Sequence, residues 1–525
     1  MEQIAEDHEH YLRLAGRWGR YQKIIAGIFL LTIMHIPLVV LILPMMQKTP
    51  EFLYNNAPVD RESFCANVYY TQSWEVMTQS ISITSNFNNW ASDLKIVCGT
   101  KKVFSIVGTI YFIASIAGYL AMSKFPDRYG RRTVFLCLNF FSLISLVQML
   151  FLFNFAQILI AGFVLGLSSM NLALGTVIVN ENIDGNYTAF VIGLTMAMFP
   201  LGGMINTFFM YLFNDWRYYH VLIILLVALN NYLGFKYLKE SPKWLMANHK
   251  YEEYLETIVY ISEINNTFER TWAFIEVKHF HNQGSMQSMI RKNNYQKEDI
   301  QNFRKVVYEI TDLFKFKSIR LLTISNLYLW IFSGFSFYGI LLNLEGLTGN
   351  IYIDSIVSYT AEFIAEIASG AVADKVGRKP TILWSIVLST FGCAIFPFSS
   401  SLYITIPALF MICIGVASVF NVLYIYSAEM YPTNIKSLAL GVFFVFNRIA
   451  AGTVPYILTL TPNVVFIIFL MSFGALLVMT IMPETLNKDY GDEVIEVKED
   501  VYEKDKKRSR ASSGTDYISL EEASF

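Results

Sequence analysis

About twelve apolar stretches, each long enough to cross a membrane, dominate this chain. A hydrocarbon core about 30 Å thick needs about 20 apolar residues per helix. With 54% hydrophobic residues and a mean hydropathy of +0.42, the chain has too little polar surface to coat a soluble globule of its size. We therefore predict an all-α polytopic membrane protein. The expected spans are 22–46, 103–122, 133–153, 156–180, 187–213, 218–238, 319–342, 350–372, 380–399, 402–426, 437–460 and 463–482.

A charged phrase occurs twice between these spans, as Asp-Arg-Tyr-Gly-Arg-Arg at 127–132 and as Asp-Lys-Val-Gly-Arg-Lys at 374–379. Copies in matching positions, about half a chain apart, predict two related six-helix halves. The expected organisation is an N-terminal segment 1–21, a first half 22–238 with an outside loop 47–102, a central loop 239–318, a second half 319–482 and a tail 483–525.

Lysine and arginine indicate the orientation, because short loops rich in them stay in the cytosol. The N-terminal segment, the loops 124–132 and 374–379, and Lys436 all fall on one side of the predicted topology. Both termini are therefore expected in the cytosol, and the plasma membrane is the expected location. The loop 181–186 on the same side carries neither Lys nor Arg.

The soluble segments differ in character. The central loop mixes charges with apolar residues such as Tyr254, Leu255 and Ile258, which predicts short helices. The charged, Ser-rich tail is predicted to be disordered. Cys65 and Cys98 share the outside loop, where an oxidising exterior allows a disulfide, although two free thiols fit the sequence equally well.

Several phrases carry a family resemblance. The doubled charged phrase resembles the signature of the major facilitator superfamily; the second copy matches well, whereas the first has Ser123 where the family has glycine. Three further features are similar to the organic cation, anion and zwitterion transporters within that superfamily: Asp-Leu-Lys-Ile-Val-Cys at 93–98, Glu-Ser-Pro-Lys-Trp-Leu at 240–245, and Ser-Ala-Glu-Met-Tyr-Pro-Thr at 427–433 with Pro-Glu-Thr at 483–485.

The resemblance covers about residues 15–490. It implies the major facilitator fold and a secondary active or facilitative transporter of small organic ions that works by alternating access. Sugar porters share the loop phrases, but they lack the long outside loop, and the seventh span here has no Gln-Gln pair. They remain the less favoured subfamily.

The charged phrase has a physical rationale on the cytosolic face. Its aspartate is able to cap the N-terminus of a neighbouring helix, and its arginines are able to reach acidic groups. We interpret it as a latch that holds the cytosolic side closed, although Lys and Arg also simply mark the inside. The gating or structural candidates are Asp127, Arg128, Arg131, Arg132, Asp374, Lys375, Arg378, Glu240 and Glu429.

Two ionisable residues lie deep inside predicted spans. At about 1.5 Å per residue, Glu362 sits about 18 Å before Asp374, and Arg448 lies at a similar depth after Lys436. Charges at the bilayer centre are costly, so both are expected to face the bundle interior near the midplane, where transporter sites lie.

Arg448 is the more discriminating of the two. By resemblance it occupies a position at which organic cation transporters carry Asp and organic anion transporters carry Arg, and its planar fork suits a carboxylate, sulfate or sulfonate. This implies an anionic substrate, with a cation or a sugar as alternatives. The competing interpretation is that Arg448 neutralises Glu362 or Glu366 as a buried structural pair.

Other residues are weaker candidates. Aromatic side chains of the seventh span, Tyr328 and Tyr338 above all, are expected to line an apolar pocket, and Tyr424 and Asn447 are proposed from facing helices. His35 in the first span is either a proton-coupling group or, as is more common, a packing residue.

Motifs for enzymatic chemistry are absent from the sequence: it has no phosphate-binding glycine loop, metal-ligand cluster or nucleophile elbow. We therefore expect no enzymatic activity, cofactor, metal or nucleic-acid partner. The expected partners are a small organic ion, a coupling or exchanged ion and the lipid bilayer. A different class also stays open, a transporter-like sensor or partner-binding protein that no longer transports, favoured by Ser123 and the loop 181–186.

Overall fold

Twelve helical segments of the chain are long and apolar enough to cross a membrane within the residues described by the computed structural model. Those residues are 11–35, 38–69, 71, 74–85, 87–122, 125–183, 185–248, 250–273, 312–315, 317–344, 347–398, 401–431, 433–461 and 463–486. The expected count of spans and the all-α membrane fold are thus confirmed.

The first half supplies six spans, of which the fourth is built from two helices. Its fourth span divides at Ser169, where α10 ends and α11 begins, whereas we predicted one continuous helix. The helices are α2 (Arg20–His35), α3 (Leu38–Met46), α7 (Thr100–Met122), α9 (Arg131–Met149), α10 (Phe155–Ser168), α11 (Met170–Asn182), α12 (Gly185–Phe213) and α13 (Trp216–Tyr237), with a short α8 (Phe125–Tyr129) before α9.

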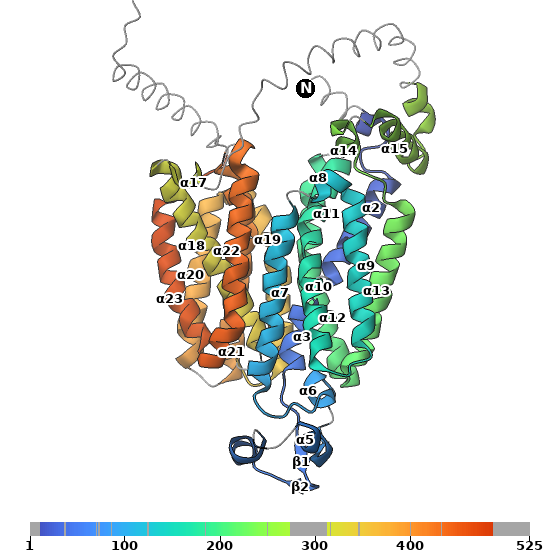
Figure 1. The fold of residues 1–525 in the computed structure, drawn as a ribbon. Coiled ribbons are helices and arrows are strands. Elements are labelled where there is room, and N and C mark those ends of the chain that lie inside the picture. Colours follow the sequence, from blue (N-terminus) through green and yellow to red (C-terminus); the bar gives the residue numbers. More distant parts are fainter. Residues whose placement is uncertain are drawn as a thin grey trace, which may run out of the picture.

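The second half packs beside the first as a separate bundle, drawn from yellow to red in Figure 1. Helices α7 and α12 of the first half pack against α22 and α19 of the second, respectively. The helices of the second half are α18 (Lys317–Leu342), α19 (Ile351–Val376), α20 (Arg378–Ile395), α21 (Leu402–Glu429), α22 (Thr433–Leu460) and α23 (Val464–Ile481), with α17 (Asp312–Lys315) and a 3₁₀ turn at Phe396–Phe398.

A small cap precedes α7 at one end of the bundle, and this end is called the cap side below (Figure 1). Within it β1 (Phe52–Tyr54) pairs antiparallel with both β2 (Ala57–Pro58) and β3 (Ile81–Ile83), a sheet that we did not predict. Asn55 and Asn56 take the positive φ of 51° and 63° that a two-residue type I′ hairpin needs. The cap also holds α4 (Arg61–Phe64), a π-helix (Cys65–Tyr69), α5 (Trp74–Ser80) and α6 (Trp90–Asp93).

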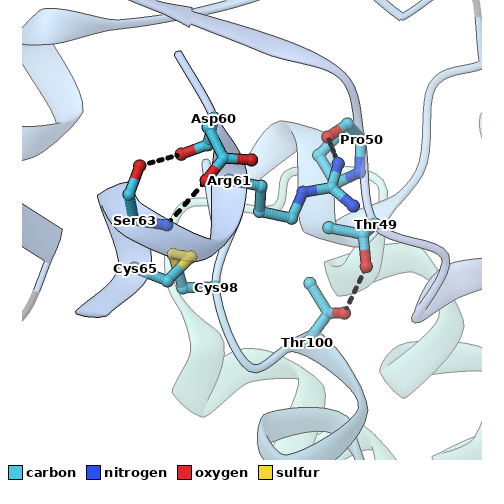
Figure 2. The surroundings of a disulfide bond; sticks show 8 residues. All are labelled: Thr49, Pro50, Asp60, Arg61, Ser63, Cys65, Cys98 and Thr100. Atoms are coloured by element: carbon cyan, nitrogen blue, oxygen red, sulfur yellow. Dashed lines mark hydrogen bonds between the residues drawn. A yellow bond between two sulfur atoms is a disulfide. The ribbon is translucent and has the colours of Figure 1, made fainter.

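A disulfide between Cys65 and Cys98 closes the cap (Figure 2), and the Cα atoms of the two cysteines are 5.7 Å apart. Close by, Asp60 caps α4 by accepting a hydrogen bond from the Ser63 amide, and this bond holds the pKa of Asp60 below its usual value. The bridge links the first residue of the π-helix to Cys98, two residues before α7 begins.

Asp93 attaches the base of the cap to the first half. Its Oδ2 accepts a hydrogen bond from Trp216 Nε1 at 2.8 Å and forms an ion pair with Arg217 at 2.9 Å. Both partners open α13, so the aspartate of the phrase at 93–98 fixes the cap to the sixth span. The cap is therefore anchored to the first half.

At the opposite end, called the motif side because it carries both charged phrases, the central loop begins with α14 (Pro242–Ala247) and α15 (Tyr251–Ile264). These are short helices of the kind predicted. The Asn265 side chain docks α15 on the start of the first span, because it accepts from the Tyr21 amide at 2.9 Å and donates to the Ala15 carbonyl at 2.7 Å. Ser123 and the predicted disordered tail beyond 486 lie outside the described residues.

Candidate functional site

A cavity lies between the two halves. Helices α2, α3, α7, α11 and α12 contribute walls from the first half, and α18, α19, α21 and α22 close it from the second. Its walls are mostly apolar and aromatic, with a few polar groups among them, which is typical of small-molecule sites. The lining residues are Ile33, Val40, Tyr111, Tyr119, Ser169, Leu172, Met196, Phe199, Pro200, Phe337, Tyr338, Glu362, Glu366, Phe420 and Arg448.

Arg448 is the cation of this cavity and is 9% exposed. Its Nη1 donates a hydrogen bond to the Tyr338 hydroxyl. The guanidinium carbon also lies 5.5 Å from the ring centroid of Tyr119 and 5.6 Å from that of Tyr338. A guanidinium stays protonated in proteins, so Arg448 places a full positive charge on the cavity wall, where its neighbours are the phenol rings of Tyr119 and Tyr338.

Glu362 and Glu366 lie one turn apart on α19 and line the same cavity. Their exposed fractions are 4% and 9%, and the Oε2 atom of each has no hydrogen-bond partner in the structure. No ion pair joins either carboxylate to Arg448, although all three side chains are described. The structural-pair interpretation of Arg448 is therefore wrong for this conformation.

The structure places the predicted substrate-binding residues in two groups. Tyr338, Arg448 and Glu362 lie together on the cavity wall. The remaining candidates do not line it: the Tyr328 hydroxyl donates to the Met471 carbonyl at 2.8 Å, and Asn447 Nδ2 donates to the Trp330 carbonyl at 3.0 Å. Tyr424 stacks beside Trp330 and Phe444 instead. His35 is buried, with Nδ1 3.0 Å from the Leu31 carbonyl, and is also absent from the cavity lining.

Sequence reasoning missed the tyrosines of the first half. Tyr111 and Tyr119 both lie on α7, two turns apart, and face the cavity because α7 packs against α22. Nothing in the sequence of α7 marks that face, because its apolar residues are spread around the whole helix, as in any span with lipid on one side and protein on the other. Phe420 of α21 was missed for the same reason.

The first charged phrase organises the motif side of the first half. Glu240 Oε1 accepts hydrogen bonds from the backbone amides of Arg131 at 2.7 Å and Arg132 at 3.1 Å, so it caps the N-terminus of α9. The Arg131 side chain forms ion pairs with Asp127 at 3.0 Å and Glu181 at 3.2 Å. Gly130, at φ 94°, leaves the space that the Glu240 carboxylate occupies.

The second phrase repeats this arrangement. Glu484 accepts from the amides of Arg378 at 2.9 Å and Lys379 at 3.0 Å, and the Arg378 side chain forms ion pairs with Asp374 at 2.7 Å and Glu429 at 3.1 Å. Our prediction that the phrase's aspartate caps a neighbouring helix is thus wrong. In both halves the aspartate pairs with an arginine, and a glutamate distant in the sequence caps the N-terminus of the following helix.

Two of these carboxylates, Glu181 and Glu484, were not among the predicted gating residues. The repeat itself carries the signal. Arg131 is 50 residues from Glu181 and Arg378 is 51 from Glu429, while the two capping bonds span 109 and 106 residues. Aligning the two halves on Gly130 and Gly377 brings Glu429 within one residue of Glu181 and Glu240 within three residues of Glu484. The remaining predicted members, Arg128 and Lys375, are exposed, and Arg128 stacks on the Tyr129 ring.

Each cluster ties together helix ends of its own half, and its ion pairs do not cross between halves. Hydrogen bonds that do cross lie toward the cap side: Gln47 Nε2 donates to the Leu342 carbonyl at 3.4 Å, and the Tyr359 hydroxyl donates to the Leu41 carbonyl at 3.4 Å. Among the described residues the hydrogen bonds between halves thus lie toward the cap side, Tyr119 and Phe444 make a ring contact across the halves nearer the motif side, and the clusters join helix ends within each half.

The chain is similar to known membrane transporters. The Major Facilitator Superfamily model matches residues 64–455 and 353–485. Solute carrier family 22 member 15-like of Xenopus tropicalis is 23% identical over 504 residues, which cover 93% of this chain and 96% of that protein. The human organic cation/carnitine transporter 2 is 22% identical, with 78% and 69% covered. The fold matches the inward-open xylose transporter XylE of E. coli with a TM-score of 0.59 at 15% identity, covering 88% of this chain and 97% of that one.

Proposed function

Because the chain belongs to the Major Facilitator Superfamily, we propose that it is a secondary active or facilitative transporter that carries small organic anions across a membrane. The negative charge of the substrate needs an argument of its own. Relatives with about 23% identity include proteins named for organic cations and carnitine, so they do not decide the charge of the substrate. The side chains of the cavity must decide it.

Arg448 carries the anion assignment. A buried cation without a carboxylate partner is costly, and a bound anion would supply the partner that Arg448 lacks on this cavity wall. The guanidinium fork binds a carboxylate or sulfonate through two parallel hydrogen bonds. Phe337 and Phe420 on the walls suit the apolar body of an organic anion.

Alternating access follows from how the halves are joined. The two motif-side clusters make each half a stiff unit, and the hydrogen bonds between halves lie toward the cap side. Rocking of one unit against the other would open the cap side and close the motif side around the cavity. This geometry fits a state in which the cavity faces the motif side.

We place the motif side in the cytosol and the cap outside the cell, in the plasma membrane. The lysine and arginine distribution supports this orientation. The disulfide in the cap fits it as well, because disulfides persist in oxidising compartments.

The test is counterflow in proteoliposomes that contain the purified full-length protein, with radiolabelled benzenesulfonate as the probe because its charge does not change with pH. We expect exchange that unlabelled benzenesulfonate saturates. Arg448→Asp should lower the rate at least about tenfold, since it replaces attraction by repulsion at a desolvated site. Lys102→Asp makes the same charge change on the exposed cap-side end of α7 and should transport normally. Equal rates in the two variants would rule out anion recognition by Arg448.

An organic cation is the second candidate, and Glu362 with Glu366 favours it, since two carboxylates without partners face the cavity. The same liposomes loaded with radiolabelled benzyltrimethylammonium separate the two assignments. Wild-type exchange of this cation with no exchange of benzenesulfonate would replace our proposal by cation transport.

A further inference from the structure

The Glu362–Glu366 pair places two carboxyl groups on the wall of the cavity, and anion binding by Arg448 does not by itself explain why they are there. The two side chains share one face of α19, because residues four apart are neighbours on a helix. Each is more than nine-tenths buried, and each points an oxygen without a hydrogen-bond partner into a largely apolar surrounding. Neither has an ion-pair partner in the structure.

Two adjacent carboxylates in such a place do not both remain ionised, because like charges and burial each favour a bound proton. With one proton the pair carries one negative charge, and this charge balances the guanidinium of Arg448 across the same cavity. The empty cavity is then electrically neutral. A monoanion bound to Arg448 adds a negative charge, and a second proton on the pair removes it.

We propose that Glu362 and Glu366 form a proton-binding site, and that one proton crosses the membrane with each monoanion. The inference rests on the proposed anion transport and names its coupling ion. The proton binds a free Oε2 atom when the anion enters, and it leaves for water when the anion departs on the other side. No bond between heavier atoms forms or breaks.

The other ionisable groups near the pair are one guanidinium, that of Arg448 on α22, which stays cationic in proteins, and several phenols and thiols. The described α12 wall consists of uncharged side chains such as Met196 and Phe199. The ionisable groups that line the cavity with the pair are Tyr111 and Tyr119 of α7, Tyr338 of α18 and Arg448 of α22. Tyr359 of α19 itself and Cys413 of α21 lie close enough to Glu362 to interact with it electrostatically, while Arg378 and Lys379 of α20 lie at the motif side.

The first measurement uses wild-type proteoliposomes and radiolabelled benzenesulfonate. An inward proton gradient of about 1.5 pH units should concentrate the probe up to about 30-fold, since each pH unit is a factor of ten for one coupled proton. Because the loaded cavity is neutral, a potassium potential set with valinomycin should not change this accumulation. A second readout needs no variant: with pyranine trapped inside and no initial gradient, external benzenesulfonate should acidify the lumen.

The variants assign the proton to the pair. Glu362→Gln combined with Glu366→Gln removes both proton acceptors, so this variant should lose gradient-driven accumulation and the lumenal acidification reported by pyranine. Asp354→Asn is the matched control. It removes a buried carboxylate from the same helix, but its Oδ1 and Oδ2 already accept hydrogen bonds from Thr348 and it does not line the cavity. It should keep both activities.

The outcomes separate the two proposals. Counterflow that is present in wild type, without accumulation under the proton gradient and without lumenal acidification, overturns the proton coupling and leaves anion transport standing. Accumulation that survives in the double glutamine variant overturns the assignment to this pair. Failure of wild-type counterflow overturns anion transport and, with it, the coupling.

Discussion

Replacing Gly377 by alanine tests the motif-side clusters most directly. Gly377 has φ 118° and ψ 156°, a combination that is nearly confined to glycine. A Cβ atom at this position would lie 2.8 Å from Glu484 Oε2, so the carboxylate would have to leave its place at the N-terminus of α20. The substitution therefore affects both the backbone and the cap.

The free energy of unfolding is expected to fall by about 3 kcal/mol. The backbone strain contributes about 1 to 3 kcal/mol, and losing the cap costs about 0.5 to 2 kcal/mol. Arg378 and Lys379 each donate an amide hydrogen bond to Glu484, so displacing this one carboxylate releases both bonds. For a folding unit of the size of one half, this corresponds to a fall in Tm of about 6 to 12 °C.

The measurement is thermal unfolding of the detergent-solubilised full-length protein, followed by intrinsic fluorescence at one scan rate. Gly370→Ala is the matched control, because it lies on α19 and an added Cβ there meets nothing within 4 Å. That variant should be unchanged or slightly more stable, since alanine favours a helix over glycine by about 1 kcal/mol. If Gly377→Ala unfolds at the same temperature as Gly370→Ala, our account of Glu484 as the N-terminal cap of helix α20 is refuted.

Two further predictions concern the cavity and the cap. Tyr338→Phe removes the hydroxyl that orients the Arg448 guanidinium, so the KM for benzenesulfonate should rise about five- to tenfold with little change in kcat. The control is Tyr328→Phe, which should leave KM unchanged because the Tyr328 hydroxyl bonds outside the cavity. Equal KM values in the two variants would show that Tyr338 does not contribute to substrate binding. Cys65→Ser combined with Cys98→Ser opens a loop of 33 residues, whose closure by the disulfide is worth about 3 to 4 kcal/mol of chain entropy. Limited proteolysis should therefore cut the cap faster in this variant, whereas the control Cys137→Ser should be cut at the wild-type rate. Equal cleavage rates would refute a stabilising disulfide.

Most of the membrane architecture could be predicted from the sequence, because a span needs only length and apolar composition. The twelve spans therefore agree with the structure, with ends that differ by a few residues. The break at Ser169 was missed because apolar residues flank the short polar stretch Ser168–Asn171 on both sides and no proline marks it. The cap sheet was missed because its strands are only two or three residues long, too short for a period-two pattern to be visible.

Depth in the membrane could also be read from the sequence, and it led to Glu362 and Arg448. Which face of a helix meets the cavity could not be read in the same way. Tyr328 and Tyr338 lie on one helix and look alike as candidates, yet one bonds to α23 and the other to Arg448. The angular position of a residue depends on how neighbouring helices pack, and no property of the residue itself reports it.

The sequence by itself therefore determined a carrier built of two six-helix halves, with ionisable residues near the middle of two spans and a charged phrase at one end of each half. Only the tertiary structure decided the partners of those charges. Arg448 packs against tyrosines instead of pairing with Glu362, and Glu240 and Glu484 cap the helices that follow the two phrases. Composition and spacing act along the chain, whereas an ion pair or a cap joins residues about 50 to 110 positions apart and depends on the packing of helices around them.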